Sequence, residues 1–524
     1  MRKFLFLLLS VCCLLASCTK TETKTPTESE PTVGNRPIVD PKPYVPTDTT
    51  ISFKDDNADK VNYKNPTFNV DKYTESGKGN IKLYQLFGDG MCLQRDAINR
   101  IWGKVSGSKN IAIEFDGVVY YGTVGEGRAF EVYLPKMNAG GPYEMTIIAE
   151  SGRMTIKDVY VGEVYLCSGQ SNMEWQIGHS GDVLKEYYSS SDAENDNIRM
   201  YNLGFYPQNE PTTEVVNNCK WEGANQSTVK AFSAVGYIFG KQLQEELDCP
   251  VGLIWAAIGG SSIEFWLSEE NYDKVKNIYK PYTTSEIYMT PCQGYNGMLY
   301  PLTGINTRGV LWYQGCSNAF GTQKYYDQAL EIFIDQCRDL FDNDQLSFTI
   351  CQLARYEGNP YAYSIVNEKI NLVAAKDPYV VVSRNLDQGD WKDIHPKDKV
   401  AVAERAAYET LRVFFKYDKP EPIKVTDYTF NEDGTVTITL SDNAILKNGN
   451  NGFEVCINGK FTYNCKVSID GNKLTIIADG DITQVRYGYT CNMTEEIMSD
   501  VSKMVTVYDS NGFPLDLFLI SKTE

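Results

Sequence analysis

The sequence predicts an α/β protein in which a mainly parallel sheet, flanked by helices, has one β-domain before it and another after it. Strand-like and helix-like stretches alternate between residues 158 and 415, which is typical of a parallel sheet covered on both faces. Strand-like runs separated by glycine-bearing turns occupy residues 66–157, and helical patterns cease after the proline-containing stretch 419–422. These observations indicate a catalytic-type α/β domain between two β-domains.

The first 17 residues are predicted to be a lipoprotein signal peptide. Arg2 and Lys3 precede a short apolar run that closes at Leu15-Ala16-Ser17-Cys18. The run is too short to span a membrane and has the layout of a secretory signal. Its end resembles the bacterial lipobox, in which the cysteine is lipidated, so Cys18 is the expected lipidation site. We therefore expect a lipid-anchored protein of the cell envelope, in the outer membrane, facing the periplasm or exposed at the surface.

The rest of the chain divides into a tether and three domains. Residues 18–65 are rich in Thr, Pro, Glu, Asp and Lys, and such a segment is predicted to be a disordered tether. Residues 66–157 are predicted to form an N-terminal β-sandwich, with strands at 110–115 and 144–149. In residues 158–415 the expected strands are 159–167, 197–203, 251–257, 309–312, 347–353 and 379–383, and the expected helices are 229–246, 325–340, 363–376 and 398–411. In the C-terminal β-domain, 416–524, the expected strands are 436–440, 453–457, 473–477 and 485–489.

The chain contains two histidines, His179 and His395. Imidazole is the usual base for activating a hydroxyl nucleophile near neutral pH, because its unperturbed pKa lies in that range. His395 stands in Asp393-Ile394-His395-Pro396, so a loop there can present a carboxylate and an imidazole together. His179 lies in Gly178-His179-Ser180-Gly181 and either lines the pocket or is an exposed loop residue.

The candidate nucleophile is Ser171, in Gly169-Gln170-Ser171-Asn172-Met173. The preceding run, 159–167, alternates and then becomes mostly apolar, as a strand entering a buried sheet does. Small residues then break the run. The serine is therefore predicted at the carboxyl end of a strand, where open α/β sheets hold their ligands. The alternative is that Ser171 or Asn172 is only a helix N-cap, since both residue types are favoured there.

Longer stretches are more specific than these short motifs. They are residues 91–95, 140–144, 158–175, 232–237, 259–264, 296–298, 308–318 and 393–396. In these stretches, and in their order along the chain, the sequence resembles the sialate O-acetylesterase group of the SGNH hydrolases.

The resemblance implies an SGNH-hydrolase-like catalytic domain in residues 158–415 and a serine esterase that needs no cofactor. Ser171 matches the nucleophile of the family, His395 its general base, and Asp393 the carboxylate that orients the base. An oxyanion develops in such a reaction and needs preorganised donors. The candidate donors are the backbone N–H of Ser171, a backbone N–H at Gly260 in the Gly259-Gly260 turn, the amide of Gln314 and, as a further candidate, Asn318.

One position departs from the family pattern. The chain has Gln314-Gly315-Cys316 where the family usually has Gln-Gly-Glu. If that glutamate is the acid of the triad, the role rests on Asp393 alone. We interpret Cys316 as a small buried hydrophobe, because unpaired cysteines are often buried.

The composition limits the partners. With 50 basic and 68 acidic residues, nucleic acid is disfavoured as a partner, and contact with a membrane is expected through the lipid anchor alone. No metal site or cofactor is predicted, because zinc-type spacings and phosphate-binding loops are missing from the sequence. Cys456 and Cys465 are a candidate disulfide between neighbouring strands.

The sequence therefore favours a carbohydrate O-acetylesterase that acts on acetylated sugars, with sialic acid as the favoured substrate. One alternative is an acetylesterase for xylan, pectin or another plant glycan. The other is a catalytically silent sugar-binding lipoprotein on the same scaffold.

Overall fold

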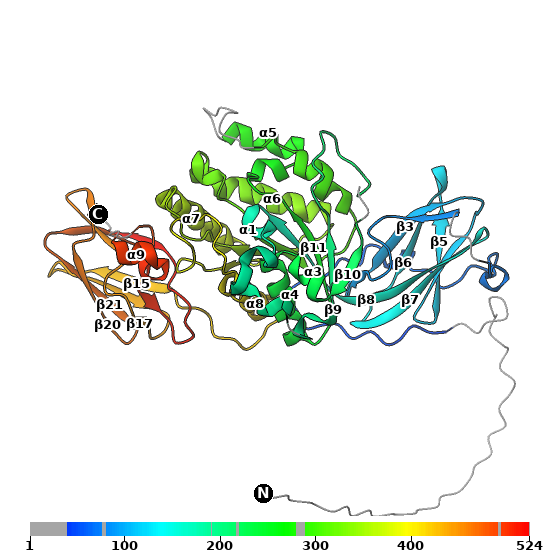
Figure 1. Ribbon diagram of the computed structural model, residues 1–524, viewed down its shortest axis with the longest axis horizontal. Coiled ribbons are helices and arrows are strands. Elements are labelled where there is room, and N and C mark those ends of the chain that lie inside the picture. Colours follow the sequence, from blue (N-terminus) through cyan, green and yellow to red (C-terminus); the bar gives the residue numbers. More distant parts are fainter. Residues whose placement is uncertain are drawn as a thin grey trace, which may run out of the picture.

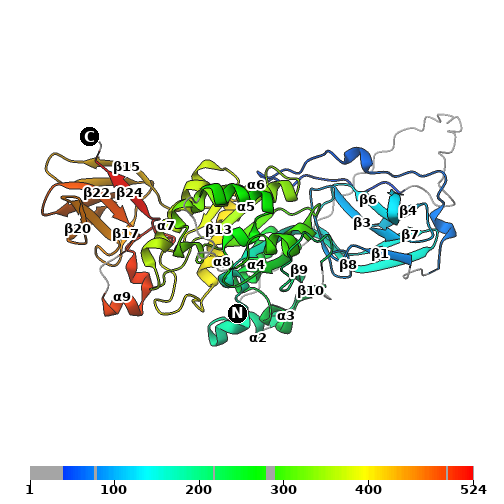
Figure 2. The same ribbon diagram turned by 90° about the horizontal axis from the view of Figure 1, so that it is seen from above.

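A computed structural model of the 524-residue chain describes residues 39–75, 80–189, 191–215, 219–278, 289–490 and 494–522. The predicted signal peptide, 1–17, and the predicted lipidation site Cys18 lie outside the described residues. Two β-rich parts flank a central α/β part, and the three lie in a row in both views (Figures 1 and 2). The α/β class that the sequence predicts is confirmed.

The central sheet is built around one long strand, β8 (Gly152–Gly169). Its parallel part has the order β9-β11-β8-β12-β13-β14, and β10 is added antiparallel to β9 at the edge. All five residues of β12 and of β13 are buried, as expected for parallel strands covered on both faces. The other strands are β9 (Asn195–Asn202), β10 (Trp221–Ala224), β11 (Val251–Ala257), β12 (Gly309–Tyr313), β13 (Ser347–Cys351) and β14 (Val380–Ser383).

Helices cover the two faces of this sheet (Figure 1). On one face α4 (Ala234–Leu247) packs against α8 (Val400–Phe414). On the other, α6 (Tyr326–Leu340) packs between α5 (Glu269–Ile278) and α7 (Pro360–Lys376). The single helix expected at 229–246 is wrong in one respect. The structure has a short α3 (Gln226–Lys230) and then α4, because the Ser233 side chain accepts the N–H of Gly236 and starts a new helix.

The N-terminal β-part and the α/β part share one continuous sheet. The order β1-β3-β6-β5-β4-β7-β8 leads directly into the parallel strands. The domain boundary expected between residues 157 and 158 therefore falls inside β8, at Asp158, where the backbone φ is 54°. The strands before β8 are β1 (Ile81–Leu83), β2 (Cys92–Gln94), β3 (Asn99–Val105), β4 (Ile111–Phe115), β5 (Val118–Val124), β6 (Ala129–Leu134) and β7 (Gly140–Ala149).

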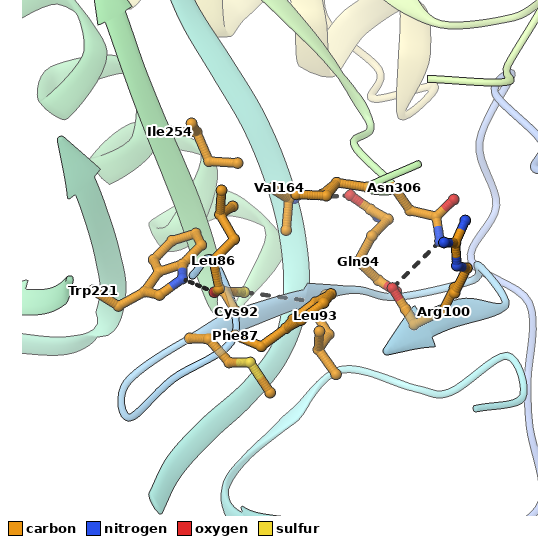
Figure 3. A pocket seen from close by; sticks show the side chains of 13 residues that line it. Leu86, Phe87, Cys92, Leu93, Gln94, Arg100, Val164, Trp221, Ile254 and Asn306 are labelled. Carbon is orange, nitrogen blue, oxygen red and sulfur yellow. Dashed lines mark hydrogen bonds between the residues drawn. The ribbon is translucent and has the colours of Figure 1, made fainter. Parts of the chain in front are cut away.

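Side chains also hold this junction together. Figure 3 shows a small pocket there, in which Trp221 Nε1 donates to the carbonyl of Leu86 at 2.8 Å and Gln94 Oε1 accepts the N–H of Val164 at 2.8 Å. Beside it lies a buried ion cluster, in which Arg308 of the α/β part contacts Glu163 at 2.7 Å and Asp96 of the N-terminal part at 2.6 Å. Removing one partner of such a buried cluster is strongly destabilising, so the contact with Asp96 ties the two parts together.

The predicted disordered tether is wrong for its second half. Residues 39–65 are described, and Ile51 is 3% exposed. The carbonyl of Ile51 accepts from Arg308 Nη1 at 3.0 Å, and the N–H of Thr50 donates to Phe414 O at 2.9 Å. Ile51 is the one buried residue of 39–65, so a single apolar side chain with a few backbone hydrogen bonds attaches this stretch to the folded part. Residues 18–38 of the predicted tether lie outside the described residues.

The C-terminal part has its own apolar core between small antiparallel sheets. Cys456 lies on β18 and Cys465 on β20, in different sheets, and both are free, so the candidate disulfide is wrong. The elements of this part are β15 (Val425–Phe430), β16 (Val436–Leu440), β17 (Ile445–Leu446), β18 (Phe453–Ile457), β19 (Lys460–Thr462), β20 (Cys465–Asp470), β21 (Lys473–Ala478), β22 (Ile482–Tyr487), α9 (Glu495–Ser499), β23 (Val507–Tyr508) and β24 (Phe518–Ser521).

Candidate active site

Ser171 opens the short helix α1 (Ser171–Glu174) directly after β8. The turn before it needs glycine, since Gly169 has a φ of 141° and a Cβ there would come within 2.2 Å of the Tyr313 carbonyl oxygen. The N-cap of α1 is Gln170, whose carbonyl accepts the N–H groups of Met173 and Glu174. The alternative reading of Ser171 as an N-cap is therefore wrong. Its hydroxyl stands at the carboxyl edge of the central strand.

His395 meets this hydroxyl from a loop that follows β14. Its Nε2 lies 2.8 Å from Ser171 Oγ. Asp393 Oδ1 accepts the backbone N–H of His395 at 2.8 Å and lies 3.7 Å from His395 Nδ1. The imidazole stacks on Trp175, with ring centroids 5.4 Å apart and an interplanar angle of 18°. The structure thus brings Ser171, His395 and Asp393 together from two segments more than 200 residues apart.

The electrostatic setting suits a base. Burial lowers the pKa of His395 below its ordinary value of 6.5; Asp393 acts in the opposite sense, and Lys399 adds to the lowering. The imidazole is therefore neutral near pH 7 and able to accept a proton. His179 is exposed, and its ring lies edge-on to Trp175 at 5.5 Å. His179 is thus exposed and borders the site, but it lies in the 3-10 helix Ile177–Leu184 rather than in the predicted loop.

The Gly259-Gly260 turn lies beside the serine. A Cβ on Gly259 would come 3.4 Å from the Cβ of Ser171, and the N–H of Gly259 donates to Glu174 Oε2 at 2.6 Å. Gly260 has a φ of 75°, and its carbonyl accepts from Ser317 Oγ at 3.0 Å. These contacts fix the turn next to α1.

The two candidate side-chain donors, Gln314 and Asn318, are buried and hydrogen-bonded within the protein. Gln314 Nε2 donates to Asn318 Oδ1 at 2.8 Å and to the Ser261 carbonyl at 3.2 Å. Asn318 Nδ2 donates to Glu264 at 3.1 Å and to Thr322 at 2.9 Å. In this structure the two amides join the ends of the strands that surround the serine.

Comparison with known proteins shows which proteins this chain is similar to. Residues 161–412 match the family model described as "Carbohydrate esterase, sialic acid-specific acetylesterase". Human sialate O-acetylesterase is 26% identical over 416 residues, which cover 68% of this chain and 76% of the human protein. The mouse sialate O-acetylesterase is 24% identical over 435 residues, 68% of this chain and 79% of the mouse protein.

The chain is a carboxylic-ester hydrolase that is similar to the sialate O-acetylesterases. A solved structure agrees: a carbohydrate acetylesterase from Xanthomonas citri superposes with a TM-score of 0.74 at 25% identity, covering 84% of this chain and all of that one. The resemblance seen in the sequence is thereby confirmed.

In this esterase Cys316 is buried, with 3% of its surface exposed, and burial raises the pKa of its thiol to about 11. The thiol therefore stays protonated, and the interpretation of Cys316 as a small buried residue is confirmed.

Lys399, Asn172 and Trp175 are parts of the site that were not predicted from the sequence. Lys399 is fully buried, and its Nζ donates to Asn172 Oδ1 at 2.6 Å. Asn172 Nδ2 in turn donates to the carbonyl of Ile394 at 3.1 Å. The signal available in the sequence was the position of Lys399, four residues after His395 and at the start of a predicted helix.

Proposed function

We propose that this esterase removes O-acetyl groups from sialic acids through an acetyl-enzyme formed on Ser171. The observation that carries the proposal is the 2.8 Å contact between Ser171 Oγ and His395 Nε2, which is the distance at which a base can take the proton of an attacking hydroxyl. Asp393 supports the imidazole from its other side.

The reaction would run in two halves. Ser171 Oγ attacks the acetyl carbonyl while His395 takes its proton, and the tetrahedral oxyanion is met by backbone N–H groups of Ser171 and Gly260. The N–H of Ser171 lies at the start of α1, where helix N–H groups have no partner inside the helix. His395 then protonates the sugar oxygen as it leaves. Water, activated by the same imidazole, hydrolyses the acetyl-enzyme to acetate and frees Ser171.

The substrate class is drawn from the relatives. The human and mouse proteins are named sialate O-acetylesterases, which supports a sialic acid. The Xanthomonas citri neighbour is named a carbohydrate acetylesterase, which supports acetylated carbohydrates more widely. Acetylated xylan, pectin or another plant glycan is therefore the second candidate substrate.

Acetate release from O-acetylated sialic acid and from acetylated xylan, measured side by side, separates the two. A kcat/KM at least about tenfold higher on sialic acid, a margin of about 1.4 kcal/mol in transition-state stabilisation, is the expected result. The opposite ranking would replace sialic acid by a plant glycan. Ser171→Ala serves as the blank in both assays.

We also propose that the enzyme is lipid-anchored through Cys18. The sequence carries this proposal. Cys18→Ala should abolish labelling by a radioactive fatty acid, and retained label would refute the anchor. A chain cut at residue 39 keeps the packed segment around Ile51 and should be soluble and active, whereas one cut at residue 65 loses it and should be less stable.

A further inference from the structure

Lys399 is a buried cation beside the Ser171–His395 pair. It stands just before α8 with none of its surface exposed, and its hydrogen-bond partner is the neutral amide of Asn172. Burying an ammonium group without an ion-pair partner is costly. A residue kept at such a cost is a candidate for a role in function.

The contacts of Lys399 reach both halves of the pair. Asn172 follows Ser171 on α1, and its Nδ2 holds the carbonyl of Ile394, the residue before His395. Lys399 Nζ also lies 5.7 Å from the centre of the Trp175 ring, on which His395 stacks. Lys399 and Asn172 therefore link the nucleophile helix to the loop of the base.

The charge of Lys399 acts on the same loop. The ionisable groups that influence the pKa of Lys399 are Cys316, three residues after β12, Cys351 at the end of β13, and Asp393 and Asp398 on the loop. Burial lowers the pKa of Lys399 to about 7, against the smaller opposing effect of these groups. His395 takes up its proton below pH 6.5, where Lys399 is mostly charged, and a nearby cation disfavours the imidazolium.

We propose that Lys399 is a positioning residue of the catalytic centre: through Asn172 it holds the His395 loop against the nucleophile helix, and its positive charge keeps His395 in the neutral form. The inference rests on the proposed roles of Ser171 and His395.

The test is the pH profile of kcat/KM for Lys399→Met, with Lys397→Met as the control. Lys397 is exposed and lies two residues away on the same loop. In Lys399→Met we expect kcat to fall by about ten- to a hundredfold with KM little changed, because the base is misplaced rather than removed. The acid limb of the profile should also move to higher pH, by roughly half a unit or more, because the cation that opposes the imidazolium is gone.

A loss of packing alone would lower kcat without moving the acid limb, so an unmoved limb would overturn the electrostatic part of the proposal. A kcat within about threefold of wild type, a change of well under 1 kcal/mol, would overturn the positioning part. Lys397→Met should behave as wild type in both respects.

If Lys399→Met does not fold, Asn172→Asp provides the test, since it keeps the volume and gives Lys399 an anionic partner. The carboxylate offsets the cation and no longer donates to Ile394, so kcat should fall and the acid limb should again move to higher pH. If the pH profile of kcat/KM is unchanged in Asn172→Asp, Lys399 and Asn172 do not position His395. Should Ser171→Ala retain wild-type turnover, the proposed function itself fails, and that result is distinguishable from either outcome above.

Discussion

The two sides of the Ser171–His395 contact are held in different ways. On the nucleophile side, Asn172 and Met173 are at most 1% exposed, and the backbone of β8 packs directly on β12. On the base side, the side chains of His395 and Asp393 are 30% and 48% exposed. The nucleophile is thus fixed by its own strand, whereas the base depends on contacts made by side chains from other parts of the chain.

The supports of the base side come from far along the sequence. Trp391, two residues before Asp393, packs against Ile497, Val501 and Met504 of the C-terminal part. The carbonyl of Trp391 accepts the N–H of Glu357 at 3.0 Å. The C-terminal part therefore packs against the loop that carries His395 and supports it.

The largest effect is expected on the nucleophile side. Ser171→Ala should lower turnover by about four to six orders of magnitude, because no other group can form the acetyl-enzyme. Acetate release in single-turnover assays measures this, and the thermal unfolding midpoint should stay within a degree or two of wild type, since a small polar group at a half-buried position carries little stability. Turnover near that of wild type would remove Ser171 from the mechanism.

Asp393→Asn tests the base side and should cost less. The amide favours the wrong tautomer of the imidazole, which in a tightly bonded triad costs about 10⁴. Here Asp393 is half exposed and lies 3.7 Å from Nδ1, so we expect about a hundredfold loss in kcat, with water screening part of the effect. If the variant stays within about tenfold of wild type, far below the loss typical of a triad acid, another group orients His395.

The nucleophile side depends on local residues and the base side on distant ones, and this difference explains which parts of the site can be predicted from the sequence. The position of Ser171 after a strand and a tight turn is predicted from a few neighbouring residues, because an apolar run followed by Gly169 favours that local structure. Its assignment as nucleophile rather than helix N-cap depends on the family resemblance. The pairing of His395 with Ser171 needed the family resemblance, and Lys399 and Trp391 were missed. Their importance arises from contacts with Asn172 and Ile497, which lie more than 100 residues away.

The tether shows the same limit. Its composition predicts disorder, yet Ile51 is buried, and the backbone beside it is hydrogen-bonded to Arg308 and Phe414, which lie far along the sequence. Composition indicates how much apolar surface a segment can bury within itself. It does not indicate which contacts a neighbouring domain can make with that segment.

Trp391→Ala should separate loop support from general stability. Removing the ring leaves a cavity between the loop and the C-terminal part, which we expect to lower kcat/KM by about tenfold and to cost about 3 kcal/mol of stability. Trp221→Ala is the matched control: it is a tryptophan of similar burial at the N-terminal junction. It should cost similar stability but leave kcat/KM unchanged well below its unfolding temperature. Equal losses of activity in the two variants would mean that the C-terminal contact has no specific effect on the base.

The smallest expected effect is the loss of unfolding free energy caused by the buried Lys399. Burial lowers the pKa of Lys399 from 10.5 to about 7. Between these values the folded protein has released a proton that the unfolded chain still binds, so the free energy of unfolding should rise with pH in that window. The contribution is at most about 1.4 kcal/mol for each pH unit.

Urea unfolding of wild type and Lys399→Met at pH 7.5 and pH 9.5 measures it. Over this interval the free energy of unfolding of the wild type should rise by roughly 2 to 3 kcal/mol more than that of the variant, while Lys397→Met should follow the wild type. If the free energy of unfolding rises equally in wild type and Lys399→Met, the buried ammonium group does not lower the stability of the fold. The base side would then be held without loss of stability, as the nucleophile side is. A larger gain in the wild type, together with the loss of kcat in Lys399→Met, would show that the loop of the base is held in place at the expense of stability, whereas the serine is held by packing that stabilises the fold.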